Sequence, residues 1–143
     1  MTAIASILLI LTTAITTNPK ELLSEQPEVI TAVAPTFPAI LVGANINGKA
    51  VVEATVNSKG EVASTQVVEG HPLIKRMTKL LDATLKRWRF STIGEEGKMR
   101  KARIVFVFTI VPERTPEGEL TTVFRPPYEV EVKHRPYSES VVK

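Results

Sequence analysis

The stretch from Leu73 to Trp88 constrains the fold most, because its apolar residues recur with the period of an α-helix. At 100° per residue they fall within an arc of about 140°, and charged residues occupy the opposite side. The apolar positions are Leu73, Ile74, Met77, Leu80, Leu81, Leu85 and Trp88. A stripe of this width predicts an amphipathic helix with one face packed on a sheet.

The residues before this helix predict a β-hairpin. Apolar and polar residues alternate from Ala50 to Val56, which is typical of a half-buried strand. The sequence Asn57-Ser58-Lys59-Gly60 then predicts a turn in which Gly60 has a positive φ, and Val62–Val68 predicts the second strand. Gly70-His71-Pro72 ends that strand, and a proline is well tolerated at the first position of a helix.

A third strand is predicted from Arg103 to Val111, and both of its faces are apolar. One face is expected to meet the helix, and the other needs a cover from this chain or from a partner. The order strand, strand, helix, strand predicts an α+β fold, a small antiparallel sheet with one amphipathic helix on one face. Glu119–Phe124 and Glu129–Lys133 are also strand-like, which indicates an additional C-terminal hairpin or a loose tail.

The N-terminal residues differ from the rest in composition. Residues 1–17 carry no charged side chain, and their apolar run is shorter than the roughly 20 residues of a membrane-spanning helix. They suit a signal peptide better, although no Lys or Arg precedes the run; a short anchor and a wrongly assigned start are the alternatives. We therefore expect export, a polar tether at residues 18–34, a domain at 35–112 and a C-terminal extension at 113–143.

Composition argues against an enzyme. The chain has no cysteine, which excludes disulfides, thiolate metal sites and cysteine nucleophiles. It has two histidines, His71 and His134. No spacing places a nucleophile beside a base, so we expect no catalytic residue, no cofactor and no metal. Residues 75–103 contain ten basic and three acidic side chains, a local charge of +7, against +3 for the whole chain. This patch is either a solvated helix face or a surface for nucleic acid, an acidic polymer, anionic lipid or an acidic protein.

Five short motifs follow one another in a fixed order between Pro35 and Pro112. They are Phe37-Pro38-Ala39, Gly48 before the first strand, Gly60 in the hairpin turn, Val67–Leu73 around Gly70, and Trp88-Arg89-Phe90 at the helix end. This ordered set resembles the TonB C-terminal domain family. The chain departs from the family where Ser91-Thr92 replace a proline, and where only about 17 residues stand in place of a long spacer.

The resemblance implies a periplasmic module of TonB-dependent transport that binds an extended peptide of an outer-membrane receptor by β-strand addition. By topology, the third strand is the expected edge. The partner-binding residues carried over to it are Lys101, Arg103, Ile104, Val105, Phe106, Val107, Phe108, Thr109 and Ile110. Lys98, Arg100, Lys101 and Arg103 either steer an acidic peptide flank or form a solubility rim. Inner-membrane proteins of the ExbB/ExbD type are implied partners if the N-terminus is an anchor, and peptidoglycan is a further implied partner.

Single residues have more local interpretations. Trp88 and Phe90 are expected in the core, Arg89 is expected to pair with a carboxylate or to cap carbonyls, and His71 is expected in a turn. Two other functions compete with receptor binding: an envelope adaptor that binds peptidoglycan or another protein through the basic helix face, and a small nucleic-acid binder. No nucleic-acid motif is present and export argues against the latter, so we expect no nucleic acid.

The strand-like C-terminal segment leads to one further hypothesis. Residues 119–133 are able to pair in cis with the third strand and so cover the edge that a receptor peptide would use. The protein would then be self-inhibited or would not bind a receptor.

Overall fold

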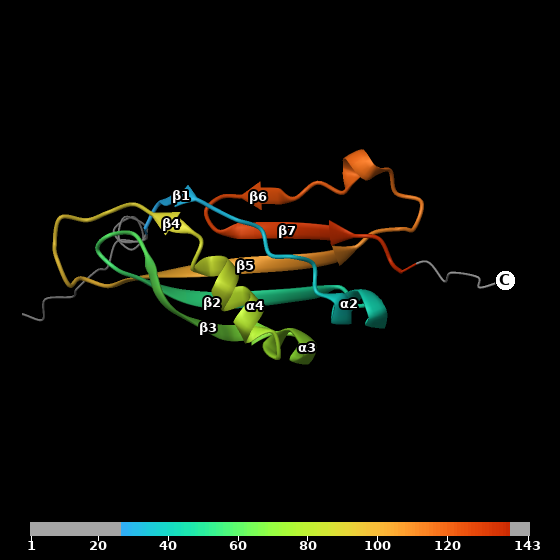
Figure 1. Ribbon diagram of the computed structural model, residues 1–143, viewed down its shortest axis with the longest axis horizontal. Helices are drawn as coiled ribbons and strands as arrows, with labels where there is room; N and C mark the ends of the chain where they lie inside the picture. The colour runs from blue at the N-terminus through green and yellow to red at the C-terminus, as the bar shows by residue number, and fades with distance from the viewer. Residues whose placement is uncertain (1–26, 138–143) are drawn as a thin grey trace, which may run out of the picture.

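The computed structural model describes residues 27–137, which are built around a five-stranded sheet with strand order β3-β2-β5-β7-β6 (Figure 1). The strands are β2 (Gly48–Val56), β3 (Val62–Gly70), β5 (Arg100–Ile110), β6 (Val123–Arg125) and β7 (Glu129–His134). Neighbouring strands are antiparallel except for β5 and β7, which are parallel. The sheet is therefore mixed, whereas a purely antiparallel sheet was expected.

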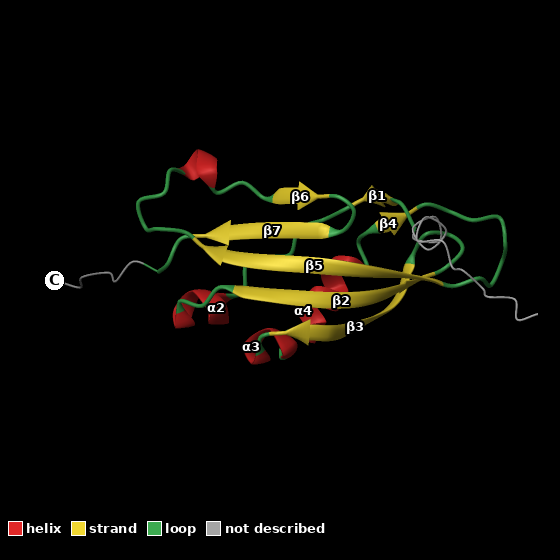
Figure 2. Cartoon of the chain, turned by 180° about the vertical axis from the view of Figure 1, so that it is seen from behind, coloured by secondary structure: helices red, strands yellow, loops and turns green. Residues whose placement is uncertain are grey.

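The remaining elements are short. They are β1 (Val29–Thr31), α2 (Ala39–Ala44), α3 (Pro72–Lys75), α4 (Thr78–Leu85), β4 (Arg89–Phe90) and the 3₁₀ turn η1 (Glu117–Glu119). Strands β1 and β4 pair with each other in a separate two-stranded sheet. The α-helices lie on one face of the large sheet, as the two opposite views show (Figures 1 and 2). The predicted α+β class is confirmed.

The core fills the space between the sheet and these helices. Every second side chain of β2 and β5 lies in this core, where it meets the apolar stripe of the helices. The largest fully buried side chains include Leu41, Val52, Val56, Ile74, Leu81, Leu85, Trp88, Ile104, Phe106 and Phe108. The expected core positions of Trp88 and Phe90 are what the structure shows.

The predicted single helix from Leu73 to Trp88 is wrong in one respect, because it is divided into α3 and α4. His71 caps α3, with its Nδ1 atom accepting the Leu73 N–H at 3.1 Å, which is the expected turn role. The N–H of Met77 donates to the carbonyl of Ile74 at 2.8 Å, and this i→i+3 bond tightens the last turn of α3. Met77 then leaves the helical region with φ −103° and ψ 29° before α4 begins.

Two glycines are required by close approach. Gly60 has φ +81°, as predicted, and a Cβ there would lie 1.9 Å from the Phe90 carbonyl oxygen. The Phe90 N–H donates to the Gly60 carbonyl at 2.8 Å, so the hairpin turn and β4 are in direct contact. A Cβ on Gly48 would lie 2.3 Å from Cδ1 of Ile74, so that glycine permits α3 to approach the sheet.

The polar-tether interpretation of residues 18–34 is wrong for residues 27–34, which pack on the domain. Pro27 is fully buried, and its carbonyl accepts a hydrogen bond from the Tyr128 hydroxyl. The Trp88 Nε1–H donates to the Val33 carbonyl at 2.8 Å. The segment is held because it supplies acceptors to two buried aromatic side chains.

The expected signal peptide or anchor at residues 1–17 lies outside the described residues. Within residues 27–137 no helix combines the length and the apolar character that crossing a membrane requires.

The predicted C-terminal hairpin is confirmed, as β6 and β7. Val130 and Tyr128 are buried with the core of the domain, so the folded body continues beyond residue 112, where the expected domain ended.

Candidate functional site

The expected docking edge on β5 is already occupied. Strand β2 pairs with one side of β5, and β7 pairs with the other side from Val105 to Ile110. The N–H of Val105 donates to the Tyr128 carbonyl at 2.8 Å, and the N–H of Val111 donates to the His134 carbonyl at 2.9 Å. The prediction that β5 is a free edge is therefore wrong over residues 105–110, and the hypothesis of a cis cover is confirmed.

The side chains of the predicted binding residues divide between two faces. Ile104, Phe106 and Phe108 point into the core and are fully buried, so they are not available to a partner in the folded protein. Val105, Val107, Thr109 and Ile110 are half-buried, and Lys101 and Arg103 are exposed. Lys101 and Arg103 precede the part of β5 that β7 covers.

The cover is apolar on its inner side. Tyr128, Val130 and Val132 are buried in the same core as β5. Burial of one such side chain stabilises a fold by about 1.5–3 kcal/mol. The hairpin is thus attached by several kcal/mol of apolar burial in addition to its backbone hydrogen bonds.

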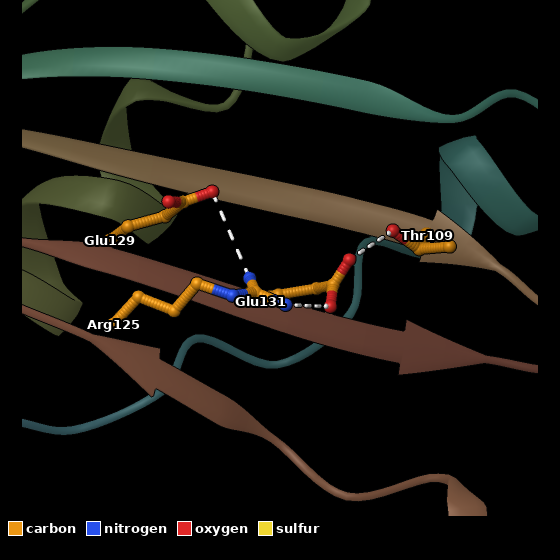
Figure 3. Close-up of polar contacts among 4 residues, drawn as sticks. All are labelled: Thr109, Arg125, Glu129 and Glu131. Carbon is orange, nitrogen blue, oxygen red and sulfur yellow. Dashed lines mark hydrogen bonds and ion pairs between the residues drawn. The ribbon is translucent and has the colours of Figure 1, made fainter.

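A polar cluster on the outer face holds the hairpin to β5 (Figure 3). Glu131 of β7 accepts hydrogen bonds from the Thr109 hydroxyl of β5 and from Arg125 Nη2 of β6, both at 3.0 Å. Arg125 also lies 3.8 Å from the carboxylate of Glu129. The hydrogen bond from Arg125 is the main cause that lowers the pKa of Glu131; the Thr109 hydroxyl and the charges of Arg125 and Lys133 add to it, against partial desolvation.

The basic residues expected to steer a peptide do not form a free cluster. Lys98 pairs with Glu95 at 3.5 Å, Lys101 with Glu53 at 3.2 Å and Arg103 with Glu69 at 3.9 Å. These three basic side chains are therefore each paired with a carboxylate.

Two arginines have structural roles. The guanidinium of Arg100 donates to the Asn57 carbonyl at 3.1 Å and to Ser91, so it ties β5 to the hairpin turn and to the residues after β4. Sequence reasoning grouped Arg100 with the steering residues and missed this role. Arg89 donates to the carbonyls of Lys86 and Trp88 at 2.9 and 2.8 Å, which is the carbonyl-capping alternative.

A groove that sequence reasoning missed lies between the N-terminal segment and the β6–β7 turn. Its volume is about 550 Å³, and its lining is mainly apolar, including Pro27, Val29, Trp88 and Pro127. Phe124 lines it as well and is 48% exposed. The sequence feature that could have indicated this groove is Arg125-Pro126-Pro127-Tyr128. Within residues 27–137 no cluster of three or more His, Asp or Glu side chains is arranged to hold a metal.

The chain is similar to known proteins in two comparisons. The family model described as Gram-negative bacterial TonB protein C-terminal matches residues 33–110. A search of curated proteins found no match. Among solved structures, the chain is similar to the solution NMR structure of the Pseudomonas aeruginosa TonB CTD, with 23% identity over 57% of this chain and 84% of that chain and a TM-score of 0.43.

Proposed function

We propose, from the premise that this chain belongs to the TonB C-terminal family, that it is a non-catalytic periplasmic module that binds an extended peptide of an outer-membrane receptor. Proteins of this family are periplasmic and envelope-associated, and their C-terminal domains act in TonB-dependent transport through protein interaction. The proposed chemistry is β-strand addition, in which main-chain groups give affinity and side-chain pockets at alternate positions give selectivity.

The observation that carries this proposal is the parallel strand β7 on β5. Residues 33–110, which match the family, contain β2, β3 and β5 but neither β6 nor β7. Within that range β5 is an outer strand, with β2 on its inner side. An extended segment with valines at alternate positions, Val130 and Val132, binds there in the intact chain. A receptor peptide with apolar residues at alternate positions suits the side of β5 that β7 occupies.

The hairpin and the receptor peptide then compete for β5. Displacement of the hairpin exposes the apolar surface of Tyr128, Val130 and Val132, so it costs several kcal/mol. We therefore expect the intact chain to bind the peptide weakly, because its apparent affinity is reduced by the small fraction of open molecules. A chain that ends at Pro112 is expected to bind more tightly.

A reversible disulfide tests the competition without truncation. The chain has no cysteine, and Val107 and Glu131 are neighbours across β5 and β7, so V107C/E131C introduces one crosslink that locks the hairpin. In a fluorescence titration with a labelled peptide from the periplasmic side of a receptor, the reduced variant is expected to bind and the oxidised variant is not.

The matched control is E53C/Q66C, which joins β2 to β3 and leaves β5 and β7 free to separate. Its oxidised and reduced forms are expected to bind the peptide equally. Equal binding by both forms of V107C/E131C would show that the peptide does not use β5.

A further inference from the structure

Strand β3 is the outer strand at the opposite side of the sheet, and its outer backbone edge is long. The Val105 N–H points to β7, and backbone groups alternate along a strand, so those of Ile104 and Phe106 point to β2. Strand β2 is in register with β5 on one side and with β3 on the other, so the same alternation continues into β3. There, the backbone N–H and C=O groups of Thr65 and Val67 point away from the sheet. These two residues offer donors and acceptors to an added strand.

The other outer strand of this sheet is much less suited to strand addition. Strand β6 has three residues, and Pro126, which has no N–H, follows it directly. Strand β3 has nine residues, and its outer edge lies along the border of the sheet in Figure 2. Among the strands within residues 27–137, β3 is the longest one with an unpaired edge.

A basic helix surface borders this edge. The Thr65 hydroxyl donates to Asp82 Oδ1 at 2.7 Å, so the side of α4 that carries Asp82 lies beside β3. Lys79 is one turn before Asp82 on the same side, and Lys86, one turn after it, pairs with Asp82 at 3.4 Å. Lys75 is on α3, which also contacts β3. Within residues 27–137, Lys75 and Lys79 are exposed and have no ion-pair partner.

We propose that the β3 edge is a second docking site, for an extended acidic segment of a partner protein. The backbone of the segment pairs with Thr65 and Val67, and alternate side chains point toward the helix surface, where carboxylates meet Lys75 and Lys79. Side chains at the other positions lie beside Ser64 and Gln66 on the open face, which accommodates small polar groups. This site is separate from β5, so it goes beyond the receptor-peptide function.

The test uses a short labelled peptide in which threonine and glutamate alternate, titrated by fluorescence anisotropy at low and high salt. The variant K75E/K79E is expected to weaken binding by roughly tenfold, and the attraction in the unmodified chain is expected to fade as salt is raised. The control R114E/K133E makes the same change of net charge on exposed or half-exposed residues away from β3, and is expected to bind as the unmodified chain does. Equal weakening by both variants would overturn the site, because it would show a response to net charge alone.

The backbone contribution is tested on the peptide, so that the protein fold is not disturbed. Methylation of the backbone nitrogens at one set of alternate positions is expected to abolish binding, and methylation of the other set to preserve it. Equal effects from both sets would exclude strand addition. The oxidised V107C/E131C variant is expected to bind this peptide normally, so loss of the β5 function and loss of the β3 site are distinguishable.

A second copy of the chain is the competing occupant. Sedimentation velocity is expected to show a monomer whose state is unchanged in K75E/K79E. A dimer that dissociates in that variant and that the peptide does not displace would overturn the proposal.

Discussion

Strands β3, β2 and β5 form the part of the large sheet that lies within the family match, and its two borders, at β5 and at β3, are protected in different ways. At β5 the chain returns, and the β6–β7 hairpin covers the strand with buried side chains and the Glu131 cluster. At β3 no strand from residues 27–137 is added; two bulges interrupt the register with β2, and polar side chains cover much of the strand. Bulges and charges discourage indiscriminate pairing but leave main-chain groups accessible. Whether a strand is available thus depends on distant residues more than on the strand itself.

Hydrogen exchange is expected to show the largest difference between the two borders. The Val105 amide donates to the Tyr128 carbonyl inside the sheet, whereas the amides of Thr65 and Val67 point outward. We expect Val105 to exchange at least about a thousandfold more slowly, because its exchange requires a costly opening. Amide-resolved NMR exchange measures this. Comparable rates at Val105 and Thr65 would mean that the hairpin opens readily and that the borders are equivalent.

Charged substitutions are expected to separate the borders in stability. Val130 on β7 is 1% exposed, and Val68 on β3 is 39% exposed. V130D buries an unpaired carboxylate and is expected to lower the free energy of unfolding by about 3–5 kcal/mol, whereas V68D is expected to change it by about 0.5 kcal/mol or less. Urea denaturation measures both. A small effect of V130D would indicate a loosely attached hairpin.

Much of this contrast was accessible from the sequence, because it depends on local patterns. Period-2 alternation identified β2, the apolar stretch from Arg103 to Val111 identified β5, the turn residues located Gly60, and the helical stripe placed Trp88 in the core. These features depend on neighbours within a few residues. The break at Met77 was missed, since the apolar spacing of α3 and α4 is continuous across it.

The long-range pairings were not determined by local patterns. The alternation in residues 129–133 is equally compatible with a hairpin, a loose tail or a strand added to β5, because it specifies a face and not a neighbour. The acidic residues and prolines of residues 18–34 suggested a tether, but residues 27–34 are held by the pairing of β1 with β4, by apolar side chains packed against the core and by the acceptors they supply to Trp88 and Tyr128. The structural role of Arg100 was missed for the same reason, since its partner Asn57 is distant in sequence.

Tyr128 is expected to give an intermediate effect, because it links the hairpin border to the N-terminal segment. Y128F leaves the Pro27 carbonyl without its donor and is expected to cost about 1–2 kcal/mol, whereas Y137F, at a tyrosine that is 58% exposed, is expected to cost almost nothing. Thermal denaturation of the two variants measures the difference. Equal midpoints would mean that the segment is not held through this hydroxyl.

The same tyrosine makes the stability depend on alkaline pH. Burial raises the pKa of Tyr128 above its ordinary 10.0, while the charge of Arg100 opposes the increase. The stabilisation is complete below pH 10 and is lost as pH rises through the higher pKa of the folded state. We expect this loss in urea titrations of the unmodified chain to be smaller in Y128F. An identical alkaline response in both would show that the raised pKa of Tyr128 does not contribute to the free energy of unfolding.

The smallest expected effect concerns the Glu131 cluster and acid. The pKa of Glu131 is lowered in the folded state, chiefly by the Arg125 hydrogen bond, so the unfolded chain binds its proton first as pH falls. The contribution is complete at neutral pH and is lost below about pH 5, through the lowered pKa of the folded state. It is expected to be below about 1 kcal/mol, because the Arg125 side chain is 46% exposed.

Urea titrations at neutral and acidic pH should show less acid destabilisation in E131Q than in the unmodified chain. E69Q, which removes an exposed ion pair beside the β3 edge, should match the unmodified chain within about 0.5 kcal/mol at neutral pH. If E131Q retained the full acid response, the side-chain contacts of Glu131 would not help to hold the hairpin, and they would not distinguish this border from β3.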